Sequence, residues 1–192
     1  MANIVLSGDT SGAITLSAPA VSGSNTQTLA AVSGTLAPIV SGTAVASTSG
    51  TSIDFTGIPA YAKRITVMFS GVSTNGTSKP QLQLGSGTVT TSGYLGSFGG
   101  YQSTASGATS NYTSGFGIES ASATQALHGA FVVTNVSGNI WICTSSFGAS
   151  GANVAFFGGG SISLAGVLDR IRVTTVNGTD TFDAGTINIL YE

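Results

Sequence analysis

Charge is the scarcest property of this 192-residue sequence. Charged residues make up 6% of it, whereas about 25% is usual for soluble domains. The basic residues are Lys63, Arg64, Lys79, Arg170 and Arg172, and the net charge is −2. Five scattered cations are too few to neutralise a row of phosphates. Nucleic acid is therefore not an expected partner.

Long apolar runs are also missing. No window holds about 18 consecutive apolar residues, the length that a membrane-spanning helix needs. The first ten residues, MANIVLSGDT, lack the positive flank and apolar core of a secretory signal. We therefore expect no membrane insertion. Disorder throughout is not expected either, because disordered chains combine high charge with low hydropathy, and here the mean hydropathy is positive.

Cysteine and histidine each occur once. Cys143 has no partner for an intrachain disulfide and lies in an apolar run, so we expect a buried thiol. A zinc site takes three or four ligands, and this pair supplies at most half of them. We assign no metal site and no cofactor.

The single histidine also limits catalysis. His128 is the one candidate general base, and seven acidic residues show no spacing typical of a glycosidase pair. We assign no catalytic residue, and a carbohydrate-active enzyme that uses His128 remains a remote alternative. Asp180 and Asp183, near Asn177, offer oxygens that Ca²⁺ accepts, but decoration of a turn is the favoured interpretation.

Residues 1–50 form the first predicted region, an N-terminal anchoring or shaft arm. No charged residue lies between Asp9 and Asp54, and short apolar pieces at residues 3–6, 13–16 and 26–30 alternate with turn signals. Such strands have little core to share, so we expect an extended or intertwined β arm that is ordered by other chains. The candidate anchoring residues are Ile4, Leu6, Ile14, Leu16 and Leu29.

Residues 51–192 form the second predicted region, an all-β domain. Apolar residues alternate at period two in residues 53–55 and 65–69, which is typical of half-buried strands. Some ten short strands are expected, with hairpin turns at residues 136–139 and 176–179. The glycine clusters at 99–100 and 158–160 are interpreted as loops or close strand contacts. The pattern predicts a jelly-roll-like antiparallel β-sandwich.

Aromatic residues gather in one stretch of this domain. Tyr94, Phe98 and Tyr101 lie among glycines and serines, and Tyr112 follows after a Ser/Thr/Ala-rich segment. Aromatic faces beside hydroxyl groups suit sugars or a protein partner, so these four residues are the candidate surface or receptor contacts. The alternative is that they fill the core of the sandwich.

Three segments resemble virion proteins of tailed bacteriophages. Residues 168–191, LDRIRVTTVNGTDTFDAGTINILY, resemble the C-terminal end of a β-rich domain in tail-fibre and other particle proteins, and residues 53–67, IDFTGIPAYAKRITV, resemble its start. Residues 7–20, SGDTSGAITLSAPA, are similar to an N-terminal segment in virion proteins of phages of marine and photosynthetic bacteria. The likeness covers about residues 51–192 and carries no catalytic motif.

The resemblance implies where the protein is located and implies no reaction that it would catalyse. It implies a structural protein of the virion, assembled in the host cytoplasm, and a trimeric fibre-like appendage that is attached through its N-terminal arm. Other virion proteins of the tail or the capsid are then its partners, and a host cell-surface glycan or protein is a further one. The alternative is a capsid decoration protein that stabilises the head.

Overall fold

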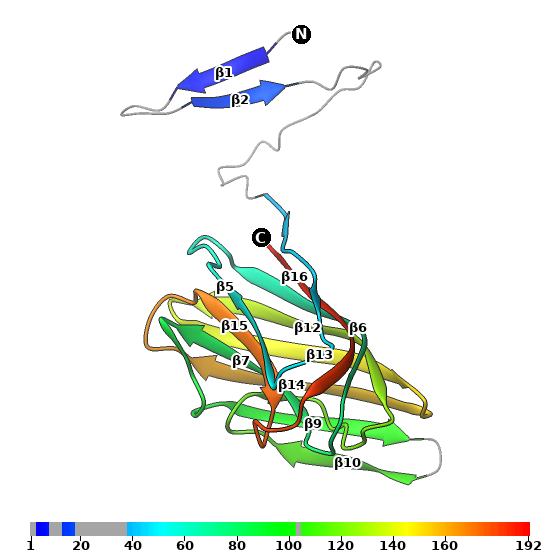
Figure 1. Ribbon diagram of the computed structural model, residues 1–192. Coiled ribbons are helices and arrows are strands. Elements are labelled where there is room, and N and C mark those ends of the chain that lie inside the picture. Colours follow the sequence, from blue (N-terminus) through cyan, green and yellow to red (C-terminus); the bar gives the residue numbers. More distant parts are fainter. Residues whose placement is uncertain (1–2, 8–12, 18–37, 103–104) are drawn as a thin grey trace. The chain divides into compact units, whose positions relative to one another are not determined.

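The computed structural model describes residues 3–7, 13–17, 38–102 and 105–192, in which all regular structure is β-strand (Figure 1). Every strand pair is antiparallel, and the sheets pack as a sandwich. The predicted all-β class is confirmed. The jelly-roll order of connections stays a prediction.

The chain divides into two compact units, Met1–Leu36 and Ala37–Glu192. In the first unit, β1 (Asn3–Ser7) pairs with β2 (Ala13–Ser17), and their register sets Ile4 opposite Leu16 and Leu6 opposite Ile14. Two of the three predicted strands are thereby confirmed. The third, with Leu29, lies outside the described residues, and the anchoring role stays a prediction.

The second unit contains a large sheet of nine strands and a small sheet of five. The large sheet has the order β10 (Ala105–Asn111), β9 (Leu95–Gln102), β14 (Val154–Ser163), β13 (Ile140–Ser150), β12 (Ala126–Ser137), β6 (Arg64–Thr74), β16 (Phe182–Tyr191) and β3 (Val40–Ser41), with β4 (Val45–Ala46) also paired to β16. The small sheet has the order β11 (Phe116–Gly117), β7 (Pro80–Ser86), β15 (Arg170–Thr175) and β5 (Ser52–Thr56), with β8 (Thr88–Val89) paired to β7.

The core lies between the two sheets. Alternate residues of the central strands face inward because successive side chains of a strand point to opposite sides. Fully buried members include Ile65, Val67, Phe131 and Val133 of the large sheet and Leu82, Leu84, Ile171 and Val173 of the small sheet. The period-two pattern of residues 53–55 and 65–69 thus corresponds to β5 and β6, as predicted.

The second unit begins earlier than the predicted boundary after residue 50. β3 and β4 pair with β16, and the Gly42 N–H donates to the Ile189 carbonyl at 2.8 Å. Ser47 is fully buried, and its hydroxyl donates to the Ala184 carbonyl at 2.7 Å. These contacts make residues 40–47 part of the large sheet, although their sequence has the uncharged composition of the preceding arm.

The sheet order confirms one predicted hairpin turn and corrects two other predictions. The turn at residues 136–139 joins β12 to β13 as a hairpin, as predicted. The turn at residues 176–179, where Gly178 has φ +69°, instead links β15 of the small sheet to β16 of the large sheet. Residues 158–160 are no loop, because they lie inside β14.

Glycine at residue 158 is required by a close ring contact. A Cβ atom there would lie 2.2 Å from Cδ1 of Phe98, its cross-strand partner in β9. Gly96 lies under the same ring, since its Cβ would come within 2.8 Å of the Phe98 Cε2 atom. The close strand contact that the sequence suggested as an alternative is therefore what these glycines provide.

We predict that Gly158→Ala destabilises the second unit by about 1–3 kcal/mol, the usual cost of overpacking a core. The matched control is Gly148→Ala in β13, where a Cβ meets no atom within 4 Å and reduced freedom of the unfolded chain favours alanine. Chemical denaturation of both variants measures the difference. Equal stability of the two variants would contradict the ring contact.

Candidate functional site

The aromatic residues proposed as surface contacts lie mostly in the core. Tyr94 and Phe98 are 1% exposed and Tyr112 is 5% exposed, whereas Tyr101 is 65% exposed. The rings of Phe98 and Tyr112 pack edge to face, with centroids 5.4 Å apart. The prediction of surface contact is therefore wrong for Tyr94, Phe98 and Tyr112, because alternation along β9 sends Phe98 inward and Tyr101 outward.

The buried tyrosines keep their hydroxyl groups satisfied. Tyr94 Oη accepts the Leu84 N–H at 2.7 Å and donates to the Thr90 carbonyl at 3.1 Å. Burial raises the pKa of this phenol well above its usual range. Tyr94 thereby links β7 to the segment before β9, which is a structural role.

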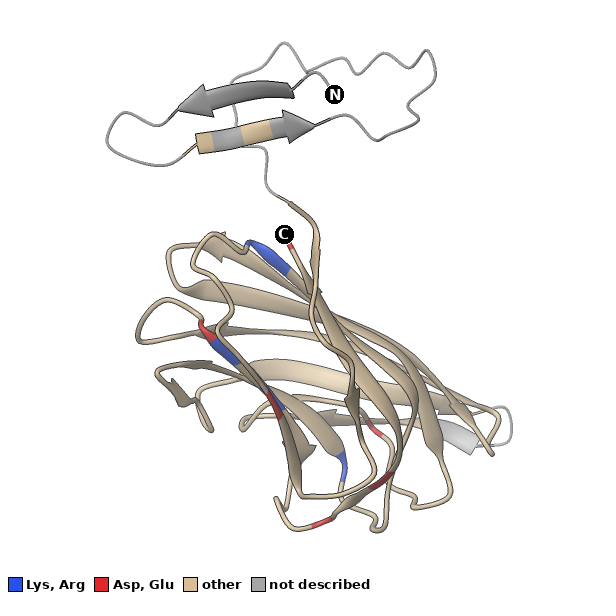
Figure 2. Cartoon of the chain, turned by 45° about the horizontal axis from the view of Figure 1, so that its top comes forward, with Lys and Arg blue, Asp and Glu red and all other residues tan. Residues whose placement is uncertain are grey.

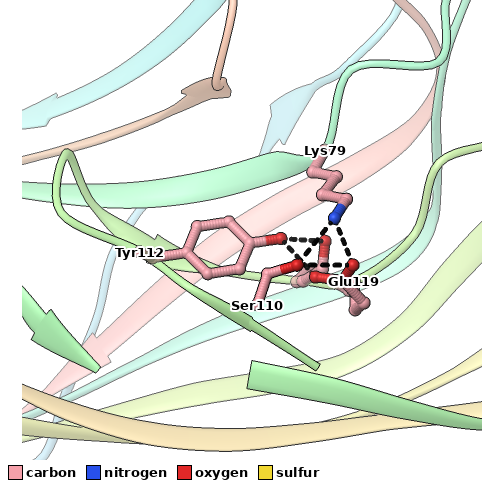
Figure 3. A network of polar contacts seen from close by, with 5 residues as sticks. Lys79, Ser110, Tyr112 and Glu119 are labelled. Atoms are coloured by element: carbon pink, nitrogen blue, oxygen red, sulfur yellow. Dashed lines mark hydrogen bonds and ion pairs between the residues drawn. The ribbon is translucent and has the colours of Figure 1, made fainter. Parts of the chain in front are cut away.

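Tyr112 belongs to a polar network around Glu119 (Figure 3). Glu119 pairs with Lys79, and its Oε1 also accepts the Ser110 hydroxyl at 2.9 Å. Its Oε2 accepts the Tyr112 hydroxyl at 3.0 Å, and Lys79 Nζ donates to Ser110 Oγ at 3.0 Å. Every member of this set has a partner, so the network ties the ends of β10 and β11 to the start of β7.

The network also sets the protonation of Glu119, whose side chain is 6% exposed. Burial alone would raise the pKa of this carboxyl, but hydrogen bonds from Lys79, Ser110 and Tyr112 outweigh it and hold the pKa below its ordinary value. Burial and the neighbouring carboxylate raise the pKa of Tyr112 well above its usual range. Glu119 is therefore an anion that the fold stabilises.

A carboxyl whose pKa falls on folding stabilises the native state above its unfolded pKa, and this contribution is lost as pH falls through the folded pKa. We predict that wild-type stability declines on acidification below about pH 4.5, the ordinary carboxyl value, and that Glu119→Gln weakens this decline. At neutral pH the free energy of unfolding of Glu119→Gln should be about 1–3 kcal/mol lower than that of wild type. Denaturation curves across this pH range measure both effects.

The control for Glu119→Gln is Asp54→Asn. Asp54 forms a bidentate pair with Arg172, both distances being 2.7 Å, but the pair is exposed. Its loss should cost under about 1 kcal/mol at neutral pH. Equal losses in the two variants would mean that the buried network adds nothing beyond an ordinary surface ion pair.

The single histidine and the single cysteine both have structural surroundings. His128 Nδ1 accepts the Gly71 N–H at 3.2 Å, and Nε2 lies 3.2 Å from Ser150 Oγ. Gly71 has φ +67° at an irregularity between β6 and β12, so the imidazole closes a bulge. Cys143 is buried, as predicted, and burial raises the pKa of its thiol well above the usual value.

Asp180 holds the turn between β15 and β16. Its Oδ2 accepts the Ser78 N–H at 2.8 Å, and its Oδ1 accepts the Asn177 amide at 2.7 Å. Asp183 instead accepts the Ser73 hydroxyl. Asp180 thus stabilises the turn, and Asp183 joins β16 to β6. In the described ranges no group of three or more His, Cys, Asp or Glu side chains could hold a metal ion.

Pockets in the described part of the chain are small and open. One of about 230 Å³ is lined by Glu119, Gln125 and Phe156, among others. Two more, of about 300 and 310 Å³, lie beside β5, one next to β16 and the other over β7 and β15. Ligand sites usually measure about 300–1,000 Å³ and enclose most of the ligand. The last two pockets reach the lower end of this range but are open to solvent, so a broad surface is the better candidate.

The candidate surface is a part of the large sheet that lacks charged residues. Five consecutive strands of the large sheet, β10, β9, β14, β13 and β12, contain no Asp, Glu, Lys or Arg. Figure 2 shows how few charged residues, blue and red, interrupt the tan of the described chain. The small sheet, by contrast, carries Asp54, Arg170 and Arg172. We call the outer side of these five strands the uncharged face.

Apolar side chains project from the uncharged face. Leu95 is 72% exposed and Phe157 is 56% exposed, and Ile142 also faces solvent. Leu95 and Ile142 both pair with Ser161, from the two sides of β14, so they lie about 10 Å apart. Tyr101 pairs with Ala155, two residues before Phe157, which makes the two rings diagonal neighbours.

Between these two apolar clusters the face is made of small residues. Ser97, Gly159 and Thr144 form one register row across β9, β14 and β13. Small side chains allow another backbone to approach closely. Sequence reasoning identified Tyr101 alone on this face, because only the strand order brings Leu95, Ile142 and Phe157 to the same side.

Comparison with protein-family models, with curated proteins and with solved structures gave no match. Within the described residues, no helix has the length and hydropathy to cross a membrane.

Proposed function

We propose that this chain is a structural protein of a tailed-phage particle, a trimeric fibre-like appendage that is attached through its N-terminal segment. In this role the protein acts by burying surface against neighbours, with no catalytic step. The observation that carries the proposal is the uncharged face, five strands wide, with apolar side chains projecting from it.

The two segments that resemble phage proteins support the proposal by their position. Residues 53–67 contain most of β5 and the start of β6, and residues 168–191 contain β15 and β16. β5 pairs with β15 in the small sheet, and β6 pairs with β16 in the large sheet. Segments about 100 residues apart in the sequence therefore form one structural frame, as expected if they derive together from one domain.

The lack of charge on the uncharged face supports a protein that is covered by neighbouring subunits. Soluble monomers rarely expose large contiguous apolar patches, and β10, an edge strand, has neither the lysine nor the proline that commonly protects such edges. A particle protein is covered by its neighbours after assembly, so it does not need this protection. Three weak contacts in one trimer would also gain avidity toward a glycan or protein of a host surface.

Cryo-electron microscopy of the native particle tests this proposal. Density for a protruding trimer on the tail or head is the expected result. Density that lies flat on the shell would establish capsid decoration instead, in which binding to the assembled state alone stabilises the head. Absence of the chain from purified particles would overturn both roles.

A truncation series tests whether the first unit attaches the chain to particles and whether the second unit folds without it. We predict that deletion of residues 1–36 leaves a cooperatively folded second unit and abolishes incorporation into particles, as judged by mass spectrometry of purified virions. Deletion of residues 1–50 also removes β3 and β4 from the large sheet, so its melting temperature should fall by about 2–4 °C per kcal/mol of lost pairing. Normal incorporation of the shorter deletion would refute the anchoring role.

A further inference from the structure

The uncharged face needs a covering partner, and its chemistry restricts which one. A partner that brought charged side chains to this face would have to desolvate them without opposite charges to pair with, which is costly. The partner surface must therefore be uncharged and partly apolar. The uncharged face of a second copy has these properties.

The size of the face also fits a subunit interface. Its five strands average about ten residues. With strands about 4.8 Å apart and about 3.3 Å per residue, the face measures about 750 Å². Stable protein–protein interfaces bury about 800 Å² per partner, so one face supplies nearly the whole contribution of one subunit.

The arrangement of projecting and small side chains on the uncharged face suits close packing against another sheet. Apolar clusters around Leu95 and Ile142, and around Tyr101 and Phe157, flank the row of small residues that includes Gly159. Sheets that pack face to face lie about 10 Å apart, with interdigitating side chains. The projecting rings of one copy can therefore pack against the row of small residues on the other copy.

From these observations we propose that copies of this chain associate through the uncharged face, with Leu95, Ile142 and Phe157 buried at the contact. The contact joins the same face of two copies, so it pairs chains about a twofold axis, and the inference does not depend on the trimer of the proposed function. Most soluble oligomers are built from identical subunits, and the contact brings together surfaces of equal polarity. It leaves the small sheet, with its Asp54–Arg172 pair, facing solvent.

The test is the oligomeric state of the purified full chain, measured by analytical ultracentrifugation over a range of concentrations. Wild type should be oligomeric, and Phe157→Asp and Ile142→Asp should each raise the dissociation constant about tenfold or more, since a charge then enters an uncharged contact. The matched control is Val167→Asp. Val167 has the same 56% exposure as Phe157 but lies between β14 and β15, outside the face.

A second measurement covers the case in which an aspartate variant fails to fold. Ser146→Cys places a thiol on the exposed side of β13, near the centre of the face, whereas the native Cys143 is buried. A short bis-maleimide should link Ser146→Cys chains to one another and should leave Thr179→Cys, in an exposed turn, largely unlinked. Equal crosslinking at the two positions would contradict the proposal.

The outcomes separate this inference from the proposed function. A monomeric wild type, or an oligomer unaffected by Phe157→Asp and Ile142→Asp, overturns the inference, even if the chain is found on particles. An oligomer that dissociates with these variants supports it, even if the chain is absent from particles.

Discussion

Phe98 lies directly against the backbone of Gly158, and the pairing of β9 with β14 depends on this contact. A side chain at residue 158 would push the ring outward and with it the edge of the large sheet. Phe98 also packs against Tyr112, whose hydroxyl group binds Glu119. The same ring therefore connects the glycine-rich strands to the polar network, and the aromatic stretch serves the interior first.

Much of the fold follows from period-two alternation. The strands that alternate clearly, such as β5 and β6, were predictable because one face is buried and the other is more exposed. β10 was not, because Ala, Ser, Gly, Thr and Asn give no contrast between its faces. The glycines at residues 158–160 left a loop open as an interpretation because glycine is common in loops, and packing against Phe98 explains the glycine at residue 158 inside a strand.

The uncharged face was less predictable than the fold, for a physical reason. Alternation tells which residues of one strand share a face, but it does not tell which strands are neighbours. Tyr101 and Phe157 come from strands some 55 residues apart in the sequence and become diagonal neighbours because β9 pairs with β14. The same limit made Asn177–Gly178 resemble a hairpin turn, although β15 and β16 belong to different sheets.

Charge is scarce in this chain, and its distribution is more informative than its amount. Asp54 and Arg172 join β5 to β15 on the small sheet, and Lys79 and Glu119 join the ends of three strands. In the described residues eight charged side chains form four ion pairs, and none of them lies in the five strands of the uncharged face. Solubility of a free subunit would be better served by charges on that face, since an uncharged sheet invites association. Its lack of charge is physically consistent with a protein whose working state is an assembly.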